Sequence, residues 1–498
     1  MNLDSDLRSV QEVRDLIGAA VTAQKEFSSF DQARVDNIVS AIAKACADAA
    51  IPLAKRAVEE TGFGVWQDKV LKNMLGSSMT WDYIKDMKTI GILSEDTRAK
   101  VMEVAAPVGV VAALIPSTNP TSTVMYKTLI ALKSGNAIVI SPHPGAKDSI
   151  LETCRVIIEA ARAAGAPNHL VNCISLPTIE GTDALIKDRR IGMILATGGE
   201  AMVRAAYSSG NPALGVGPGN GPAFIEKTAL IEPAIRRIID SKTFDNGTIC
   251  ASEQSIVTER SISEQVINTL RAHGGYFMDE TQSEAVARFI MRANGTMNPA
   301  IVGRTAQQIA DMAGISIPPG TKVLVSMQHT VGRDNPYSRE KLCPVLAFYI
   351  EENWEKGCER CIELLENEGV GHTMIIHSED PSVIREFALK KPVMRLLVNT
   401  PGALGGVGAT TALAPALTLG CGAIGGSATG DNVSPMHLIN IRRVAYGIKE
   451  LSDLRAASPV CAQSAASESV SAPSSQPSIT RAEVEAITRA VIERLGVN

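Results

Sequence analysis

Two apolar runs on either side of a helical segment place the strongest constraint on the fold of this 498-residue chain. The run VGVVAALIP (108–116) has the length and β-branched content of a buried strand, and NAIVISP (136–142) is a second run of this kind. Between them, TVMYKTLIALKSG (123–135) has a helical pattern. This strand–helix–strand unit predicts an α/β fold with a parallel sheet that helices cover on both faces.

The alternation of strands and helices continues beyond this unit. Residues 7–90 have apolar positions at helical spacing, and strands are predicted at 169–175 and 191–196. A second cycle of helices and strands begins near Ile231. We therefore place a domain boundary near Glu226.

Composition and charge exclude several classes of partner. Lys and Arg number 48 against 53 Asp and Glu, a net charge of −5 that gives no footprint for nucleic acid. The uncharged segment Leu396–Gly430 is long enough to cross a membrane, but its nine glycines and two prolines are incompatible with a lipid-embedded helix. The N-terminal residues lack an apolar core behind a basic start, so we expect no secretory signal. Nine scattered cysteines are typical of reduced thiols in a cytosol.

The last part of the chain changes composition. Residues 456–477 form a Ser/Ala/Pro-rich segment without periodicity, which predicts a disordered linker. Residues 478–498 predict an amphipathic helix in which Thr480 and Glu483 form a capping box. Its apolar residues fall on one face: Val484, Ile487, Val491 and Leu495. Because so short a helix is marginal in water, we expect it to need a docking partner.

The segment SKTFDNGTICASEQ (241–254) carries the strongest chemical signal. Its cysteine, Cys250, follows a glycine-containing turn, and at the start of a helix the backbone amides would lower the pKa of this thiol. The motif alone leaves a buried, inert cysteine as an equal alternative.

A second set of residues has nearly the spacing of a zinc finger: Cys358, Cys361, His372 and His377. However, CERCIELLEN is continuously helical in pattern, and both histidines lie in a strand-like stretch. We therefore expect no metal site.

The segment around Cys250 resembles the nucleophile segment of CoA-acylating aldehyde dehydrogenases. That group includes the acetaldehyde and propionaldehyde dehydrogenases of bacterial microcompartments and the N-terminal half of bifunctional aldehyde/alcohol dehydrogenases. Four further stretches resemble the same family in the same order: IPSTNPTSTVMYKTLIALKSGNAIVISPHPGAK (115–147), ATGGEAMVRAA (196–206), GVGPGNGPAFIE (215–226) and LGCGAIGGSATGDNVSP (419–435).

The resemblance implies an aldehyde dehydrogenase fold. Residues 1–226 would form a Rossmann-like dinucleotide-binding domain with N-terminal helices, and 227–432 an α/β catalytic domain carrying the nucleophile. Residues 433–455 would form a return segment and a small oligomerisation element. We expect a homodimer or homotetramer.

The resemblance also implies roles for individual residues. Cys250 would be the nucleophile, and the side-chain amide of Asn119 would hold the oxyanion together with the backbone N–H of Cys250. His372 would assist proton transfer, and Glu340 would hold the nicotinamide ribose. Taken alone, Asn119 is equally a turn former before Pro120. For His372 the alternative is a core histidine, and for Glu340 it is a surface carboxylate.

NAD and coenzyme A are the cofactor and co-substrate that the resemblance implies. Thr197, Gly198 and Gly199 follow a strand and open a helix, as a dinucleotide site requires, although G-x-G-x-x-G is incomplete and a purely structural turn is the alternative. Hydrolytic relatives carry Lys and Glu where Ser141 and Pro144 stand, so the choice between NAD and NADP stays open. The full set of expected cofactor-binding residues is Pro116, Ser117, Thr118, Ser141, His143, Thr197, Gly198, Gly199, Gly217 and Glu340.

One departure from hydrolytic relatives indicates the reaction type. Those enzymes carry a water-activating glutamate at the place that Val216 or Gly217 occupies here. The resemblance therefore implies oxidation of a short-chain aldehyde, by default acetaldehyde, to acyl-CoA. Propionaldehyde or sulfoacetaldehyde as the substrate, a hydrolytic dehydrogenase, and a non-catalytic scaffold are the alternatives.

The C-terminal linker and helix resemble the encapsulation peptides of microcompartment cargo. Residues 478–498 would then contact shell or cargo proteins inside a cytoplasmic microcompartment. A frayed terminus and a self-association helix are the alternatives.

Overall fold

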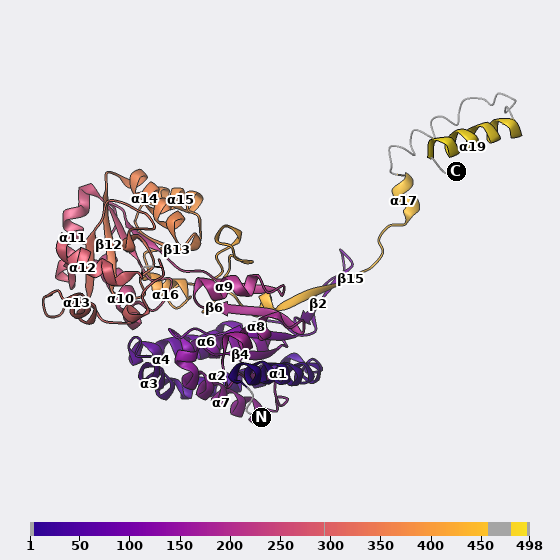
Figure 1. Ribbon diagram of the computed structural model, residues 1–498, viewed down its shortest axis with the longest axis horizontal. Coiled ribbons are helices and arrows are strands. Elements are labelled where there is room, and N and C mark those ends of the chain that lie inside the picture. The colour runs from indigo at the N-terminus through magenta and orange to yellow at the C-terminus, as the bar shows by residue number, and fades with distance from the viewer. Residues whose placement is uncertain (1–3, 293, 457–479, 496–498) are drawn as a thin grey trace. The chain divides into compact units, whose positions relative to one another are not determined.

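The computed structural model describes residues 4–292, 294–456 and 480–495. The chain divides into two units, one of residues 1–94 and 103–443 and one of residues 95–102 and 444–498 (Figure 1). The first unit contains both large sheets and all the expected site residues.

The first large sheet confirms the strand–helix–strand prediction. It has five parallel strands in the order β5-β4-β3-β6-β7. The strands are β3 (Val110–Leu114), β4 (Ala137–Ser141), β5 (Val171–Cys173), β6 (Ile191–Thr197) and β7 (Ala213–Val216). The helices that precede or connect them are α1 (Ser5–Phe27), α2 (Gln32–Asp48), α3 (Ala50–Thr61), α4 (Trp66–Met74), α5 (Thr80–Ile84), α6 (Pro120–Lys133), α7 (Lys147–Ala163), α8 (Ile179–Lys187) and α9 (Glu200–Tyr207).

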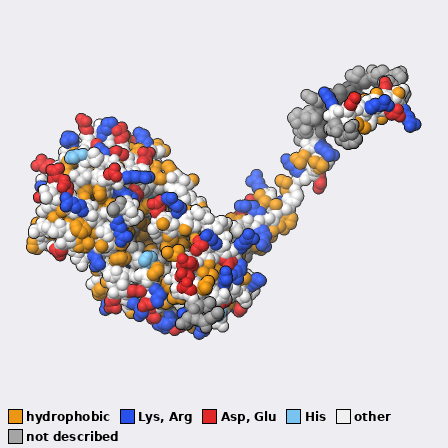
Figure 2. All heavy atoms as spheres, in the orientation of Figure 1, with side chains coloured by type: hydrophobic (Ala, Val, Ile, Leu, Met, Phe, Trp, Pro, Cys, Tyr) orange, Lys and Arg blue, Asp and Glu red, His pale blue; other side chains and the backbone are white. Residues whose placement is uncertain are grey.

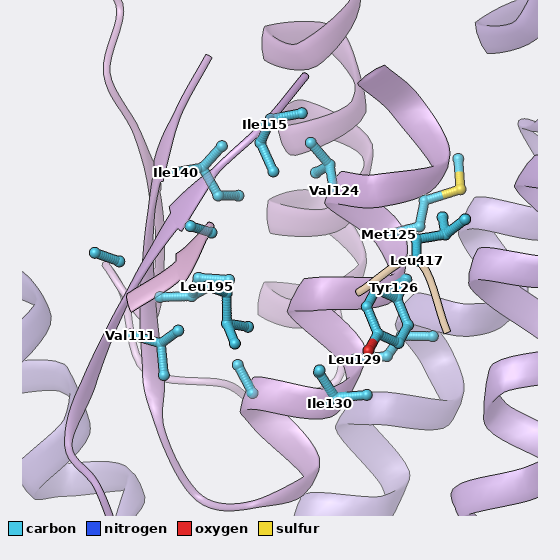
Figure 3. Packing of buried hydrophobic residues seen from close by; sticks show 14 of the residues in the cluster. Val111, Ile115, Val124, Met125, Tyr126, Leu129, Ile130, Ile140, Leu195 and Leu417 are labelled. Carbon is cyan, nitrogen blue, oxygen red and sulfur yellow. The ribbon is translucent and has the colours of Figure 1, made fainter. Parts of the chain in front are cut away.

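Helix α6 is buried along its whole length. Figure 3 shows its side chains beside Val111, Ile140 and Leu195 of the central strands, in one continuous apolar cluster. Lys127 lies within this helix and is fully buried, and its Nζ donates to Leu114 O (2.7 Å) and Leu195 O (2.8 Å), at the end of β3 and near the end of β6.

The strand order places a crevice between β3 and β6. From β3 the chain moves outward through β4 and β5, then returns to form β6 on the other side of β3. Ligands bind in parallel sheets beyond the carboxyl ends of the strands at such a reversal of strand order. Of the expected cofactor residues, 116–118 lie in the loop after β3, Thr197 is the last residue of β6, and Gly198 and Gly199 lie in the loop after β6.

The second large sheet has seven parallel strands in the order β10-β11-β12-β9-β8-β13-β14. They are β8 (Pro222–Ile225), β9 (Ser255–Glu259), β10 (Gly275–Phe277), β11 (Val323–Met327), β12 (Val345–Glu351), β13 (Gly371–His377) and β14 (Val393–Val398). The helices are α10 (Ile231–Thr243), α11 (Ser263–Ala272), α12 (Glu280–Ile290), α13 (Ala306–Ala313), α14 (Trp354–Asn367), α15 (Pro381–Lys390) and α16 (Gly402–Gly406). Because β8 belongs to this sheet, the chain changes sheets between Val216 and Pro222, a few residues before the boundary expected near Glu226.

A third sheet has the order β1-β2-β15, with β1 (Ile92–Asp96), β2 (Val101–Pro107) and β15 (Ile439–Ala445). Strand β15 lies in the expected return segment 433–455. Among the residues that the structure describes after β15 there are two helices, α17 (Leu451–Ala456) and α19 (Arg481–Leu495).

The C-terminal helix forms where the sequence predicts it. Glu483 Oε2 accepts from the Thr480 backbone N–H (2.9 Å) and hydroxyl (3.0 Å), which supports the predicted cap. Val484, Ile487 and Val491 are 52%, 63% and 50% exposed, so the predicted apolar face is open within the described residues. The predicted linker falls almost entirely on 457–479, outside the described residues.

Two further features bear on the expected partners. Among the described residues, no single helix is long and apolar enough to cross a membrane; α2 and α3 reach that composition only as a pair bent by 62°. On the face shown in Figure 2, acidic and basic side chains are interspersed over the larger unit.

Candidate functional site

The structure brings Cys250 and His372 together. Cys250 lies half-buried in a turn between the short 3₁₀ helix η3 (Phe244–Gly247) and β9. Its Sγ is 3.2 Å from Nε2 of His372 on β13. The other ring nitrogen, Nδ1, is 2.9 Å from Thr373 Oγ1. With the ring proton on Nδ1, Nε2 is free to accept the thiol proton.

The expected lowering of the Cys250 pKa is wrong. The segment after Cys250 leads into strand β9, so Cys250 does not lie at the start of a helix. Burial, followed by the charge of Glu340, raises the pKa of Cys250 to about 12. Burial and the nearby Arg395 guanidinium lower the pKa of His372 to about 3. At neutral pH, the resting pair is therefore a protonated thiol facing a neutral imidazole.

Arg395 is a site residue that the sequence analysis missed. It is buried on β14, and its guanidinium donates to His372 O (2.9 Å), Gly420 O (2.7 Å) and Thr373 Oγ1 (3.2 Å). Its positive charge opposes the rise in the Cys250 pKa. A charged residue inside the apolar strand KPVMRLLVNT was the available signal, because such a group is buried only where it has partners.

Asn119 lies beside the loop that carries Cys250. It is the residue before α6, and its Nδ2 donates to Thr248 O and to Thr118 Oγ1, both at 3.2 Å. Its Oδ1 accepts from Lys72 Nζ at 2.6 Å. The side-chain amide of Asn119 is therefore held by three partners, and one of them, Thr248, lies two residues before Cys250. These contacts go beyond the turn-forming role that the sequence left open.

A buried ionic cluster supports both Asn119 and the Cys250 loop. Lys69 and Lys72 of α4 form ion pairs with Asp245, and all three side chains are at most 3% exposed. Asp245 also accepts from Thr248 Oγ1 (2.7 Å). The sequence analysis missed this cluster, because Asp245 lies 173 or more residues from the two lysines along the chain and the three residues carry no motif.

Glu340 joins the site through a glycine. The backbone N–H of Gly219 donates to Glu340 Oε1 (2.9 Å). A Cβ on Gly219 would lie 2.0 Å from Cys250 O, so the close approach of this loop to the nucleophile requires glycine. Burial and the neighbouring Glu368 raise the pKa of Glu340 to about 8. Glu340 is thus a half-buried group near Cys250, which disfavours the surface-carboxylate alternative.

Three cavities follow one another along α9. Gly217 lines a cavity of about 860 Å³, and Gly198, Gly199 and Glu340 line one of about 840 Å³; both cavities also contact Glu200. Ser141 and His143 line the third, of about 380 Å³, which shares Ala201 and Ala205 with the second. Of the remaining expected cofactor residues, Thr197 ends strand β6, and the others lie in the loop after β3: Pro116, Ser117 and Thr118. The geometry thus gives an elongated cleft that could hold a dinucleotide or a coenzyme of similar length.

Of the two positions expected to replace the water-activating glutamate, only Gly217 lines the cleft. Val216 is 4% exposed within β7. A Cβ built on Gly217 would meet no heavy atom of the described residues within 4 Å. Gly217 therefore leaves open space beside the site where a hydrolytic enzyme would place its carboxylate.

The zinc-like spacing has no matching geometry. Cys358 and Cys361 lie on α14, whereas His372 and His377 lie on β13. Within the described residues, no group of three or more His, Cys, Asp or Glu is arranged to hold a metal ion, and the eight cysteines described there are all free.

Comparison with known sequences gives one family. The model of the aldehyde dehydrogenase family matches residues 5–325. The bifunctional aldehyde-alcohol dehydrogenase of Escherichia coli is 45% identical over 88% of this chain and 50% of its own length. The chain thus spans about half the length of the first curated relatives that it matches. Succinate-semialdehyde dehydrogenase (acetylating) of Clostridium kluyveri is 37% identical over 88% of this chain and 96% of its own.

Solved structures agree. A probable aldehyde dehydrogenase from Listeria monocytogenes has a TM-score of 0.90 and 60% identity, covering 91% of this chain and 100% of its own. A propionaldehyde dehydrogenase from a Clostridium phytofermentans microcompartment has a TM-score of 0.79 and 26% identity, covering 88% and 98%. A Rhodopseudomonas palustris propionaldehyde dehydrogenase with bound CoA and an acylated cysteine has a TM-score of 0.78 and 27% identity, covering 87% and 97%.

Proposed function

The chain belongs to the aldehyde dehydrogenase family, and from this premise we propose that it is an acylating aldehyde dehydrogenase. It would convert a short-chain aldehyde, NAD⁺ and coenzyme A into acyl-CoA, NADH and a proton. The single observation that carries the proposal is the contact between Cys250 and His372 beside a cleft in which Gly217 stands at the place of a hydrolytic base. The names of an acetylating relative and of a structural neighbour with CoA and an acylated cysteine support it.

The first half-reaction forms an acyl thioester on the protein. Burial disfavours a thiolate or an imidazolium alone, whereas moving the proton from Cys250 Sγ to His372 Nε2 creates two opposite charges that stabilise each other. The sulfur then bonds to the carbonyl carbon, and the oxyanion accepts hydrogen bonds from the Cys250 backbone N–H and from the Asn119 N–H that donates to Thr118 Oγ1 at rest. When bound, NAD⁺ supplies the hydride acceptor, and the C–H bond breaks to leave a thioester on Cys250.

The second half-reaction transfers the acyl group. His372 first releases to solvent the proton that it took from Cys250, and its Nε2 then accepts the proton of the coenzyme A thiol, whose sulfur attacks the thioester. The Cys250–acyl bond breaks, and the departing sulfur of Cys250 takes that second proton back from His372. The same two N–H donors hold the second oxyanion. Because Gly217 offers no carboxylate to activate water, water is the weaker competitor, and the coenzyme A thiol takes the acyl group from the thioester.

The test is an aldehyde panel measured by the absorbance of reduced nicotinamide. Acetaldehyde, the default substrate, propionaldehyde and sulfoacetaldehyde would each be assayed with and without coenzyme A, using NAD⁺ and NADP⁺ in turn. We expect multiple turnovers only with coenzyme A, and no turnover in the Cys250→Ala variant. Sustained NADH formation without coenzyme A would support the hydrolytic alternative, and wild-type turnover by Cys250→Ala would refute the nucleophile assignment.

A specific observation supports a further role for the C-terminal helix. The apolar side chains of Val484, Ile487 and Val491 are half or more exposed, and an apolar face on so short a helix requires a partner surface. We propose that residues 478–498 are an encapsulation peptide that binds a microcompartment shell or cargo protein. The microcompartment origin of one structural neighbour supports this proposal.

A further inference from the structure

We propose that Lys72 is a positioning residue that sets the direction of the Asn119 side-chain amide. This inference rests on the proposed function, because it concerns the amide assigned to the oxyanion. Lys72 lies on α4, buried at 2% exposure, and its ammonium meets three acceptors. They are Asn119 Oδ1 at 2.6 Å, Thr248 Oγ1 at 3.0 Å and the Asp245 carboxylate.

The chemistry of these partners admits one orientation of the amide. An ammonium only donates hydrogen bonds, so the Asn119 atom facing Lys72 must be the carbonyl oxygen. Thr248 O only accepts, so the atom facing it must be Nδ2. A charged donor on Oδ1 also polarises the amide and strengthens its N–H groups as donors. Without the ammonium, only the contact with Thr248 O still opposes a half-turn rotation of the amide. The rotated amide would present its oxygen, instead of an N–H, toward a developing anion.

The same ion pair ties the amide to the nucleophile segment. Asp245, Asn246 and Gly247 all have left-handed backbone angles, with φ of 49°, 51° and 77°. This conformation is strained for the first two residues. Asp245 is held there by the Val65 backbone N–H (2.7 Å) and by both lysines of α4. Helix α4 thus holds two parts of the site: the turn that leads to Cys250, through Asp245, and the side-chain amide of Asn119, through Lys72.

Lys69 provides a matched control. It lies one turn earlier on α4, is equally buried and forms an ion pair with the same Asp245 oxygen (2.9 Å). Its remaining contact is with the backbone at Thr118 O (2.9 Å) rather than with the side chain of Asn119. Removing Lys69 therefore removes a buried charge without removing the contact on the amide.

The experiment is a pair of double-mutant cycles on the full-length enzyme. Lys72→Met and Lys69→Met are each combined with Asn119→Ala, and the burst of NADH in a single turnover gives the rate of cysteine acylation. We expect Asn119→Ala to lower this rate by about 100-fold to 1000-fold. Lys72→Met should lower it by about 10-fold to 100-fold in the wild-type background, but by less than about threefold once Asn119 is alanine. Lys69→Met should have the same effect in both backgrounds.

The outcomes separate this inference from the proposed function. An equal effect of Lys72→Met with and without the Asn119 side chain overturns the positioning role and leaves the oxyanion assignment intact. A wild-type burst in Asn119→Ala overturns the oxyanion assignment itself. Because Lys72→Met leaves a buried carboxylate with one partner fewer, the cycles are repeated in an Asp245→Asn background, where that charge is gone. Thermal melts and dinucleotide binding identify the folded variants.

Discussion

At the residue scale, the protonation of Cys250 governs when the enzyme is reactive. Burial keeps the proton on sulfur in the resting site, with the pKa raised to about 12, and the neighbouring imidazole has its pKa lowered to about 3. Attack therefore requires the substrate carbonyl and the imidazole to act together. A resting thiolate is not available to react with other electrophiles.

This arrangement predicts a pH dependence for alkylation. Below its pKa, the fraction of a thiol present as thiolate rises about tenfold per pH unit. We therefore expect the rate of Cys250 alkylation by iodoacetamide, followed by mass spectrometry of its peptide, to rise through the range from about pH 7 to about pH 10 without a plateau. A short unstructured peptide that contains one cysteine, with an ordinary thiol pKa of about 8.5, is the control, and its alkylation rate should level off within that range. A plateau for Cys250 near neutral pH would show a resting thiolate and contradict this account.

The structure brings Cys250 Sγ and His372 Nε2 into contact, and Asn119 Nδ2 donates to Thr248 O in the loop that carries Cys250. The sequence analysis expected these three residues at one site, because each lies in a segment that is recognisable by itself. It missed Arg395, Lys69, Lys72 and Asp245, and it misjudged the direction of the Cys250 pKa shift. Both failures have one cause: burial and charge at a point in space depend on side chains from distant segments, which no local pattern reports.

At the element scale, the proposed function assigns to the connection between β7 and β8 the choice of the nucleophile that resolves the thioester. This loop carries Gly217 into the cleft and Gly219 against the Cys250 carbonyl. The sequence analysis placed the domain boundary near Glu226, after β8. Strand β8 has only four residues, and its apolar character does not tell which of two parallel sheets it joins.

Placing a carboxylate in this loop should change the reaction. Gly217 does not have a left-handed φ, and a Cβ there would enter open space, so Gly217→Glu should fold. We expect sustained NADH formation without coenzyme A to rise by about tenfold, a small part of the 10²-fold to 10⁴-fold that a well-placed general base contributes. Gly217→Gln is the matched control, since it has the same shape and no basic group. Equal rates without coenzyme A in the two variants would show that this position cannot activate water.

At the scale of the whole molecule, the described chain combines a catalytic unit with a C-terminal helix whose apolar face is open. Periodicity predicted this helix correctly, because the apolar residues of its face recur at helical spacing along one continuous segment. The same pattern does not identify the partner that this face binds, since under the encapsulation proposal the complementary surface belongs to another molecule.

The encapsulation proposal predicts that localisation and activity are separable. Deleting residues 457–498 should abolish co-localisation with microcompartment shell proteins while leaving the rate of acyl-CoA formation unchanged. Ile487→Asp, on the apolar face, should have the same effect, whereas Ala486→Asp, on the neighbouring face of the same helix, should not. Co-localisation that survives both the deletion and Ile487→Asp would reject the proposal, and a change in oligomeric state with the deletion would favour a self-association helix instead.

The two protons that Lys127 shares between Leu114 O and Leu195 O have a consequence for coenzyme recognition. The carboxyl ends of β3 and β6 border the crevice between these strands, and the amine of Lys127 links the two ends through hydrogen bonds. The spacing between the ends of β3 and β6 is therefore held by contacts within the protein. If a coenzyme binds beyond these strand ends, little conformational freedom is left there to be lost on binding.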